Sequence, residues 1–271
     1  MKLFKINSKY LIVGTFLLLS ATVCIAQSTK IKKWQYNQFD FGLGVDNDQY
    51  HRMSLNNLTA LAENPDALKR DLSGMTEEIS SSTAGLGLYF NRSYAPWSKE
   101  KAAYLSNQAL RVGIGFHSPK ESMITYKNEL LDTSIVYCNL HSEFTFEFAY
   151  LWNGTWGSKK KFVWYCGVGT NASISLSNEM LLIEGEYFEP GAHPSTQESF
   201  EENTQRFLAM PVVYNRFYVP YGVHRVVGEH WSIGFDARRG FGVQTILGGK
   251  SNLINKTGTF MIGAKYRKGG F

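Results

Sequence analysis

The chain is poor in cysteine and proline, and each shortage narrows the class of protein. It has three cysteines and seven prolines in 271 residues, against 18 phenylalanines, 15 tyrosines and 25 glycines. This balance favours strands over helices. Pairing the strand that ends at Trp152 with the one that begins at Phe162 would place Cys166 near Glu147, far along the strand from Cys138. We therefore expect two free cysteines in the mature chain and no disulfide framework.

Long apolar runs are also missing, apart from one near the amino terminus. Residues 11–23 are apolar, follow a basic start and precede the letters CIAQ. The run is shorter than the ~20 residues that a spanning helix needs. This layout is typical of a secretory signal peptide, here residues 1–26, with cleavage between Ala26 and Gln27. Lipoprotein processing at Cys24 is the alternative, although a valine replaces the small residue that usually precedes such a cysteine.

Net charge is nearly absent too. The formal charge of +5 includes Lys2, Lys5 and Lys9 of the signal, so the mature chain, residues 27–271, carries +2 (5 − 3). A chain this close to neutral gives no reason to expect nucleic acid as a partner. No pair of Cys or His has the spacing of a zinc site, and no Gly-rich phosphate loop precedes a helix. The sequence therefore indicates no metal and no cofactor.

What the mature chain has instead is period-two alternation between apolar and polar residues, bounded by turn residues. Eight such runs predict strands at residues 36–46, 83–92, 109–118, 135–152, 161–176, 207–226, 231–243 and 258–267. Long connections at one end and shorter turns at the other predict an all-β, transmembrane antiparallel up-and-down barrel of eight strands. Bends in the long fourth to sixth runs could hide two more strands, so ten strands is the alternative.

The face opposite the aromatic rings carries glycines and charges of both signs. An eight-stranded barrel has an interior just wide enough for side chains, which explains the glycines if this face points inward. Paired charges inside are normal for a small membrane barrel, because lipid supplies the apolar surroundings. A soluble lipocalin-like binding barrel, the inside-out counterpart, is the alternative. The predicted interior polar network consists of Asp40, Asp46, Arg111, Glu143, Glu147, Arg216, Asp236, Arg238 and Lys265.

Tryptophan residues lie beside the short connections. Trp152 and Trp164 flank the turn of residues 153–160, and Trp231 follows the turn after residue 226. Rings with an apolar body and a polar tip collect at the boundary between membrane and water. The three tryptophans therefore predict an aromatic girdle, with the short turns on the periplasmic side.

Three stretches carry a resemblance to a known family. They are the letters CIAQ that end the signal, VPYGVHRVVGEHWSIGFDARRGFG at residues 219–242, and the closing GTFMIGAKYRKGGF. The chain resembles the outer-membrane β-barrel proteins of Gram-negative bacteria, in particular the outer membrane protein beta-barrel domain family. The likeness covers nearly all of the mature chain but is one of pattern, without an invariant motif. It implies an outer-membrane location and contact with outer-membrane lipid and lipopolysaccharide.

The closing strand resembles the C-terminal signal that the barrel assembly machinery reads, an amphipathic strand with a terminal aromatic residue. Such signals run straight into the aromatic residue, whereas the letters KGG separate Arg267 from Phe271 here. Either Tyr266 or Phe271 would therefore be the residue that the machinery reads.

Small outer-membrane barrels include enzymes that act on lipid A acyl chains, which need His and Ser on one strand face. His141 and Ser142 are adjacent, so they point to opposite faces of a strand. We therefore expect no catalytic residues and no enzyme, with acyl chemistry on lipid A or phospholipid as the alternative function. The inward histidines would instead join the interior hydrogen-bond network.

Two long connections have no assigned role. Residues 47–82 contain leucines spaced for two short amphipathic turns on either side of Pro65, and residues 177–206 are acidic. Packing on the barrel rim and solvation are the simpler interpretations, and either loop could meet an unknown extracellular partner. The predicted function is an integral outer-membrane barrel with a structural, surface-interaction or narrow transport-related role. An interior filled by side chains leaves no wide pore.

Overall fold

The computed structural model describes residues 33–51, 53–80, 82–98, 103–104, 107–128, 130, 133–157, 161–186, 204–247 and 252–269. The predicted signal peptide and Phe271 lie outside these ranges. The chain divides into two compact units, residues 36–94 with 107–271 and residues 1–35 with 95–106, and the barrel belongs to the first. No helix of the described ranges is long and apolar enough to cross a membrane.

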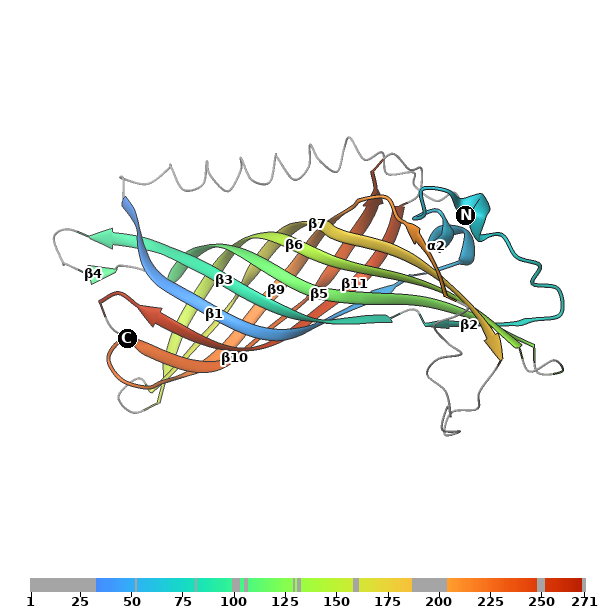
Figure 1. Cartoon of the computed structure of the whole chain (residues 1–271). Helices are drawn as coiled ribbons and strands as arrows, with labels where there is room; N and C mark the ends of the chain where they lie inside the picture. Colours follow the sequence, from blue (N-terminus) through green and yellow to red (C-terminus); the bar gives the residue numbers. More distant parts are fainter. Residues whose placement is uncertain are drawn as a thin grey trace, which may run out of the picture. The chain divides into compact units, whose positions relative to one another are not determined.

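In the described part of the chain, eleven strands form one sheet, most of which Figure 1 labels. They are β1 (Lys33–Tyr50), β2 (Thr76–Ser80), β3 (Ser82–Ser98), β4 (Ala103–Tyr104), β5 (Gln108–Asn128), β6 (Thr133–Trp156), β7 (Phe162–Glu186), β8 (Thr204–Leu208), β9 (Val212–Val226), β10 (Trp231–Ile246) and β11 (Asn252–Arg267). The path of hydrogen-bonded neighbours has ten strands, in the order β2-β5-β6-β7-β9-β10-β11-β1-β3-β4, and β8 pairs with β7. A further pairing of β3 with β5 closes the sheet.

The closed ring therefore contains the eight long strands β1, β3, β5, β6, β7, β9, β10 and β11, with β2, β4 and β8 as short additions. This confirms the predicted all-β antiparallel up-and-down barrel. Each pairing that closes the ring satisfies backbone N–H and C=O groups that an open sheet would leave at its edges. A closed ring is the only form in which strands can cross a membrane without unpaired backbone groups.

Several predicted strand ends were wrong, most of all in β5. The alternation predicted a strand to residue 118 and a loop over residues 119–134, but β5 continues through Pro119 to Asn128. Its pairing with β6 shifts register between His117 and Lys120, which marks a β-bulge. A bulge adds a residue to one strand and so reverses the parity of the side chains that follow. The period-two pattern on which the prediction rested therefore stopped at the bulge.

The hairpin of β6 and β7 also has a different register from the predicted one. Cys166 lies opposite Trp152, not near Glu147, because β6 continues to Trp156 before the chain turns. Cys138 and Cys166 are both free. Residues 207–226, predicted as one strand, are divided between β8 and β9. Pro211, which has no N–H to donate, lies in the break between them.

Side chains on the ring strands alternate between the interior and the outer surface. On β6, the side chains of Glu143, Thr145 and Glu147 are at most 4% exposed, whereas Phe146 is 59% exposed. The same parity runs along β1, where Asp46 and the glycines are buried and every second residue from Phe41 is exposed. The barrel therefore has an apolar outer surface and a polar interior.

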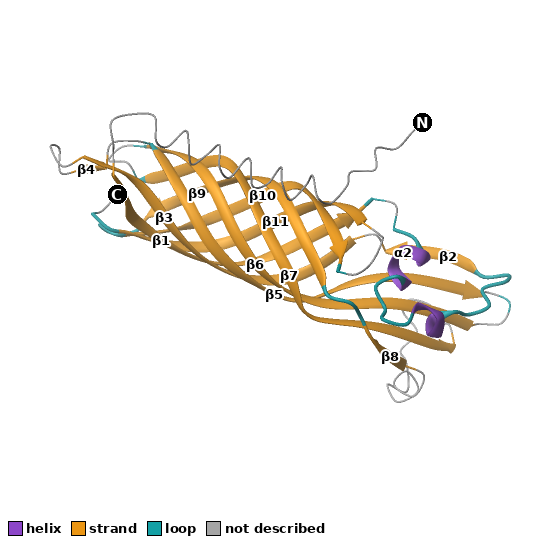
Figure 2. Cartoon of the chain, turned by 90° about the horizontal axis from the view of Figure 1, so that it is seen from above, coloured by secondary structure: helices purple, strands orange, loops and turns teal. Residues whose placement is uncertain are grey.

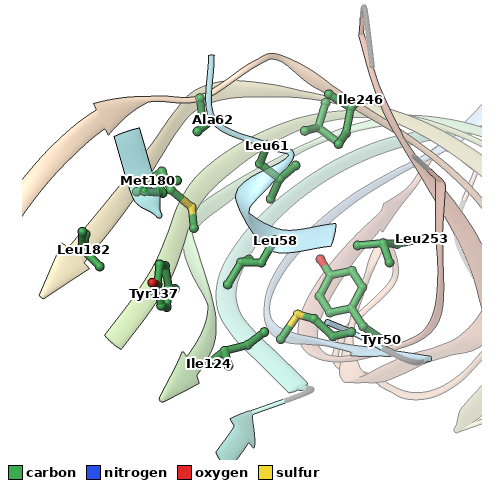
Figure 3. Close-up of a cluster of buried hydrophobic side chains, with 14 of the residues drawn as sticks. Tyr50, Leu58, Leu61, Ala62, Ile124, Tyr137, Met180, Leu182, Ile246 and Leu253 are labelled. Carbon is green, nitrogen blue, oxygen red and sulfur yellow. The ribbon is translucent and has the colours of Figure 1, made fainter. Parts of the chain in front are cut away.

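An apolar cap covers the end of the barrel at which β1 leads into β2. α2 (Leu55–Thr59) and η1 (Pro65–Leu68) lie in this connection, which confirms the two short turns predicted around Pro65. Figure 2 shows both helices (purple) beside β2 and the ends of the ring strands. Leu58 and Leu61 pack there against Tyr50, Tyr137 and Leu253 (Figure 3). Because Tyr50 and Leu253 lie near the ends of ring strands, the cap packs on this end of the barrel.

Candidate functional site

The barrel interior holds a column of buried charged side chains, which we call the charge ladder. Among the described residues it contains six carboxylates and five cationic groups, and three histidines are buried with them. Its members are Asp40, Asp46, Asp48, Glu143, Glu147 and Asp236, then Arg111, Lys120, Arg216, Arg238 and Lys265, and finally His117, His141 and His224. All nine residues of the predicted interior network are among these buried side chains.

The first cluster of the ladder lies beneath the cap. Both terminal nitrogens of Arg216 contact the Glu143 carboxylate, at 2.9 and 3.0 Å. Asp48 accepts hydrogen bonds from Arg216 at 3.1 Å and from the Lys120 Nζ at 2.9 Å. The ring of Tyr214 lies 4.6 Å from the Arg216 guanidinium carbon. Two carboxylates and two cations thus neutralise one another in a site that water does not reach, which is the condition for burying charge at all.

The second cluster is centred on Glu147. Arg111 contacts one carboxylate oxygen at 2.8 Å, and Arg238 contacts the other at 2.6 Å. The Arg238 guanidinium carbon is also 4.4 Å from the centre of the Tyr89 ring. The alternation had predicted that Glu143 and Glu147 would meet Arg111, Arg216 or Arg238, and the structure brings these side chains together.

Asp46 joins strands that are far apart in the sequence. Its carboxylate accepts hydrogen bonds from the Tyr89 hydroxyl and the Thr259 hydroxyl, both at 2.5 Å, and lies 2.5 Å from His117 Nδ1. His117 Nε2 lies 3.0 Å from the Thr145 hydroxyl. One aspartate therefore connects β1, β3, β5 and β11 across the interior.

The last cluster lies toward the short turns. Asp236 is 3.2 Å from the Lys265 Nζ, 2.7 Å from His224 Nε2, and accepts a hydrogen bond from the Tyr165 hydroxyl at 2.6 Å. Asp40 accepts one from the Gln38 amide at 2.7 Å. The ladder thus extends through the barrel from the short turns to the cap.

Glycines make room for this network. A Cβ at Gly87 would lie 2.7 Å from the Asp46 carboxylate and 2.8 Å from the Tyr89 hydroxyl. Real Cβ atoms do not approach other atoms so closely, so a larger residue at position 87 would displace the aspartate or the tyrosine. This crowding is what the prediction of a narrow, glycine-lined interior required.

The three predicted girdle tryptophans lie at the strand ends near the short turns. Trp152 and Trp231 are 42% and 51% exposed. Trp164 is opposite Gly154, and a Cβ at that glycine would collide with the indole, so the ring occupies the space beside this glycine. The ring of Trp231 contacts that of Tyr266, with centroids 5.2 Å apart. Tyr266 therefore belongs to the same aromatic zone.

Sequence reasoning missed Asp48 and Lys120, two of the four charged groups of the first cluster. Asp48 continues the parity of Asp46 on β1, so a strand extended by four residues would have included it. Lys120 follows the β5 bulge, and no alternation in the sequence indicates its inward direction. Asp48 could therefore have been predicted from the alternation. Lys120 could not, because the bulge reverses the parity of β5 just before it.

The geometry does not give His141 the serine beside it in the sequence as a nucleophile. His141 is buried, its Nδ1 lies 3.2 Å from the Asn139 side-chain oxygen, and its ring stacks on Tyr214. Ser142 points to the other face, where its hydroxyl is 2.6 Å from that of Ser177. The described residues also contain no group of three or more His, Cys, Asp or Glu side chains that could hold a metal ion.

Comparisons with known proteins give structural likenesses alone. No family model matches the chain, and no curated protein matches its sequence. Neisserial surface protein A (NspA) aligns at 12% identity and a TM-score of 0.32, over 85% of this chain and 97% of that one. The attachment invasion locus protein Ail of Yersinia pestis, in complex with the heparin analogue sucrose octasulfate, aligns at 8% identity and a TM-score of 0.30. That alignment covers 86% of this chain and 100% of Ail. The outer membrane protease OmpT from Escherichia coli aligns at 10% identity and a TM-score of 0.31, over 89% of this chain and 100% of OmpT.

Proposed function

We propose that the chain is an integral outer-membrane β-barrel protein with a closed interior and a surface role at its capped end. The observation that carries this proposal is the distribution of apolar side chains. Phe146, Phe235 and Ile262 point outward and are 59%, 56% and 57% exposed, while eleven charged side chains are buried. Soluble monomers rarely expose apolar patches beyond a few hundred Å². In a bilayer this outer surface contacts lipid instead of water, so its apolar side chains carry no free-energy cost of exposure to water.

A soluble lipocalin-like carrier would need the opposite arrangement. Its interior would be apolar and would have space for a ligand, and its outer surface would be polar. Here Arg111 and Glu143 are 1% and 0% exposed inside the barrel, so an apolar ligand would have to displace paired charges. This supports the membrane barrel over the carrier.

A wide pore is also unsupported, which favours a surface or structural role over transport. Paired side chains occupy the interior at three levels, and the apolar cap packs on one end of the barrel. The capped end also carries the two predicted connections that we propose as sites for an extracellular partner, residues 47–82 and 177–206. In the structure, parts of the first belong to β1, β2 and β3 and parts of the second to β7 and β8, and residues 52, 81 and 187–203 lie outside the described ranges. The placement of Ser142 and His141 on opposite faces supports a non-enzymatic role.

The proposed orientation places the short turns in the periplasm and the cap outside the cell. Trp152, Trp231 and Tyr266 would then mark the periplasmic boundary of the bilayer, where amphipathic rings are favoured. Tyr266 is outward-facing and lies in this zone, which supports it as the residue that the barrel assembly machinery reads; Phe271 lies outside the described residues. Outer-membrane lipid and lipopolysaccharide would contact the outer surface.

Fractionation tests the proposal. The full chain, expressed in a Gram-negative host, should be found in the outer-membrane fraction. It should migrate faster on a gel when unboiled than when boiled, because a closed barrel resists unfolding by detergent. Recovery in the soluble periplasmic fraction would reject the proposal. A signal-deleted chain, residues 27–271, is the control that should stay in the cytoplasm.

A further inference from the structure

Two cationic side chains on neighbouring strands lie close together on the outer surface of the barrel rather than inside it. Arg239 on β10 and Lys256 on β11 are both exposed and have outward parity. Their neighbours on the same strands include Phe241 and Ile254, which are 61% and 54% exposed. Of the carboxylates in the described ranges, none forms an ion pair with either cation.

The register brings the two cations close together. Arg239 is opposite Gly258, and Phe241 is opposite Lys256, so the cations are diagonal neighbours on adjacent strands. Diagonal neighbours have Cβ atoms about 7–8 Å apart, within the reach of long side chains. One anionic group could therefore contact both.

Gly258 leaves an open notch between them. A Cβ at this glycine would meet nothing closer than 4.0 Å, and the atoms at that distance are the backbone oxygens of Arg238 and Asn47. Asn47 and Gln49 on β1 are exposed beside Gly258 and Lys256, so hydrogen-bonding amides border the notch on its other side. The row below it, with Val45, Phe260 and Ala237, is apolar.

The depth of the notch places it at a membrane boundary. Arg239 is eight residues beyond Trp231 on β10 (239 − 231), and Lys256 is ten residues beyond Tyr266 on β11 (266 − 256). At ~3.3 Å per residue and a tilt of ~40°, these spans rise about 20 and 25 Å. The apolar band of a small outer-membrane barrel is ~25 Å tall. With the aromatic zone at the periplasmic boundary, the two cations lie where the headgroups of the outer leaflet begin.

We propose that Arg239, Lys256 and the notch at Gly258 bind the phosphate of an outer-leaflet phosphoglycolipid. This inference rests on the proposed outer-membrane location. Cations bind phosphate through charge-assisted hydrogen bonds, which are stronger where water is scarce. Long cationic side chains at a membrane boundary also reach toward water, and that tendency alone would explain their exposure. That tendency would not make the two cations prefer one lipid over another. An experiment can measure such a preference.

The test compares a phosphorylated glycolipid with the same glycolipid without phosphate, and with a phospholipid that has a phosphate but no sugar. The folded, detergent-solubilised full-length protein is titrated with bisphosphorylated lipid A, with enzymatically dephosphorylated lipid A, and with phosphatidylglycerol, and bound lipid is counted by native mass spectrometry. We expect at least about tenfold tighter binding of bisphosphorylated lipid A than of either other lipid, from two charge-assisted contacts. Equal binding of dephosphorylated lipid A would reject phosphate recognition. Equal binding of phosphatidylglycerol would reject the glycolipid.

Variants locate the site. The double variant Arg239→Gln/Lys256→Gln should lose about tenfold in affinity for bisphosphorylated lipid A. The matched control Arg92→Gln/Arg225→Gln removes two exposed outward arginines elsewhere on the barrel and should bind as the unaltered protein does. Gly258→Leu keeps both charges but fills the notch, and should also weaken binding. Equal affinities for the double variant and its control would overturn the inference.

Heat modifiability and fractionation keep this result separate from the proposed function. A double variant that fractionates with the outer membrane, shifts on boiling and still binds the lipid fully rejects the phosphate site alone. Recovery of the unaltered protein in the soluble fraction rejects both.

Discussion

Glu143 shows how single residues hold the interior together. Its carboxylate contacts Arg216 twice and Lys120 at 3.3 Å, and it is fully buried. Replacing it by glutamine would leave two buried cations sharing Asp48. Removing one partner of a buried charge pair costs about 3–5 kcal/mol. We expect Glu143→Gln to lower the free energy of unfolding by this amount, measured by urea unfolding of the barrel in lipid vesicles.

Glu179 provides the matched control for that substitution. It pairs with Arg206 at 3.6 Å, and the two side chains are 46% and 74% exposed. Exposed pairs contribute about 0–1 kcal/mol, so Glu179→Gln should have a small effect. If the two variants unfold at the same urea concentration, the ladder does not stabilise the barrel as its geometry suggests.

The two cysteines report on the surroundings of single positions. Cys166 is exposed on the outer surface, beside Val168. Cys138 lies on the part of β6 next to the cap, where burial raises the pKa of its thiol to about 12 and leaves little thiolate at neutral pH. We expect a water-soluble maleimide to label neither cysteine in vesicles and both in urea. Rapid labelling of the folded protein that Cys166→Ala abolishes would contradict a lipid-facing position for Cys166.

At the scale of elements, buried leucines pack the cap against the ring strands. Leu58 and Leu61 are each 1% exposed in a segment whose helices are five and four residues long. Such short helices are not stable alone. A buried Leu→Ala change costs about 2–5 kcal/mol. Leu58→Ala should therefore loosen the cap and speed trypsin cleavage after Lys69 or Arg70 by at least about tenfold, the factor that 1.4 kcal/mol produces.

The ring itself should not respond to that change. The temperature at which Leu58→Ala loses its heat-modifiable band should stay near that of the unaltered protein, because the charge ladder and strand pairing remain. The exposed Asn56→Ala provides a control inside α2, and should leave cleavage unchanged. A variant in which cap and ring loosen together would show that they unfold as one unit.

The outcome for each element shows what alternation can predict. The ring strands alternate between an apolar face and a charged face, so the sequence alone predicts which side chains point inward. This is why the alternation could predict that Glu147 would meet an inward arginine, here Arg111 and Arg238. Parity is lost at the bulge between His117 and Lys120, and with it the inward direction of Lys120. Register between strands depends on where the turn begins, which is why the predicted partner of Cys166 on β6 was wrong. Leucine spacing alone predicted the turns of the cap.

At the scale of the whole molecule, the barrel separates a charged interior from an apolar outer surface. Inside, the six carboxylates and five cations of the described residues leave a formal charge of −1 (5 − 6). Near neutrality matters because a net charge in a narrow, water-poor interior has little compensation. Outside, apolar side chains contact what we propose is lipid. The same alternation therefore satisfies both environments, and neither the ladder nor the apolar surface would be stable without the other.

This arrangement predicts a barrel that does not conduct ions. The unaltered protein, reconstituted into planar bilayers, should show no stepwise conductance, because paired side chains block the interior at several levels. A variant with residues 54–73 replaced by a short Gly-Ser linker should also be silent, since the clusters of Glu143, Glu147 and Asp236 remain. Steps in the linker variant alone would identify the cap as the barrier. Steps in the unaltered protein would show that the ladder opens, and would favour a transport role over a surface one.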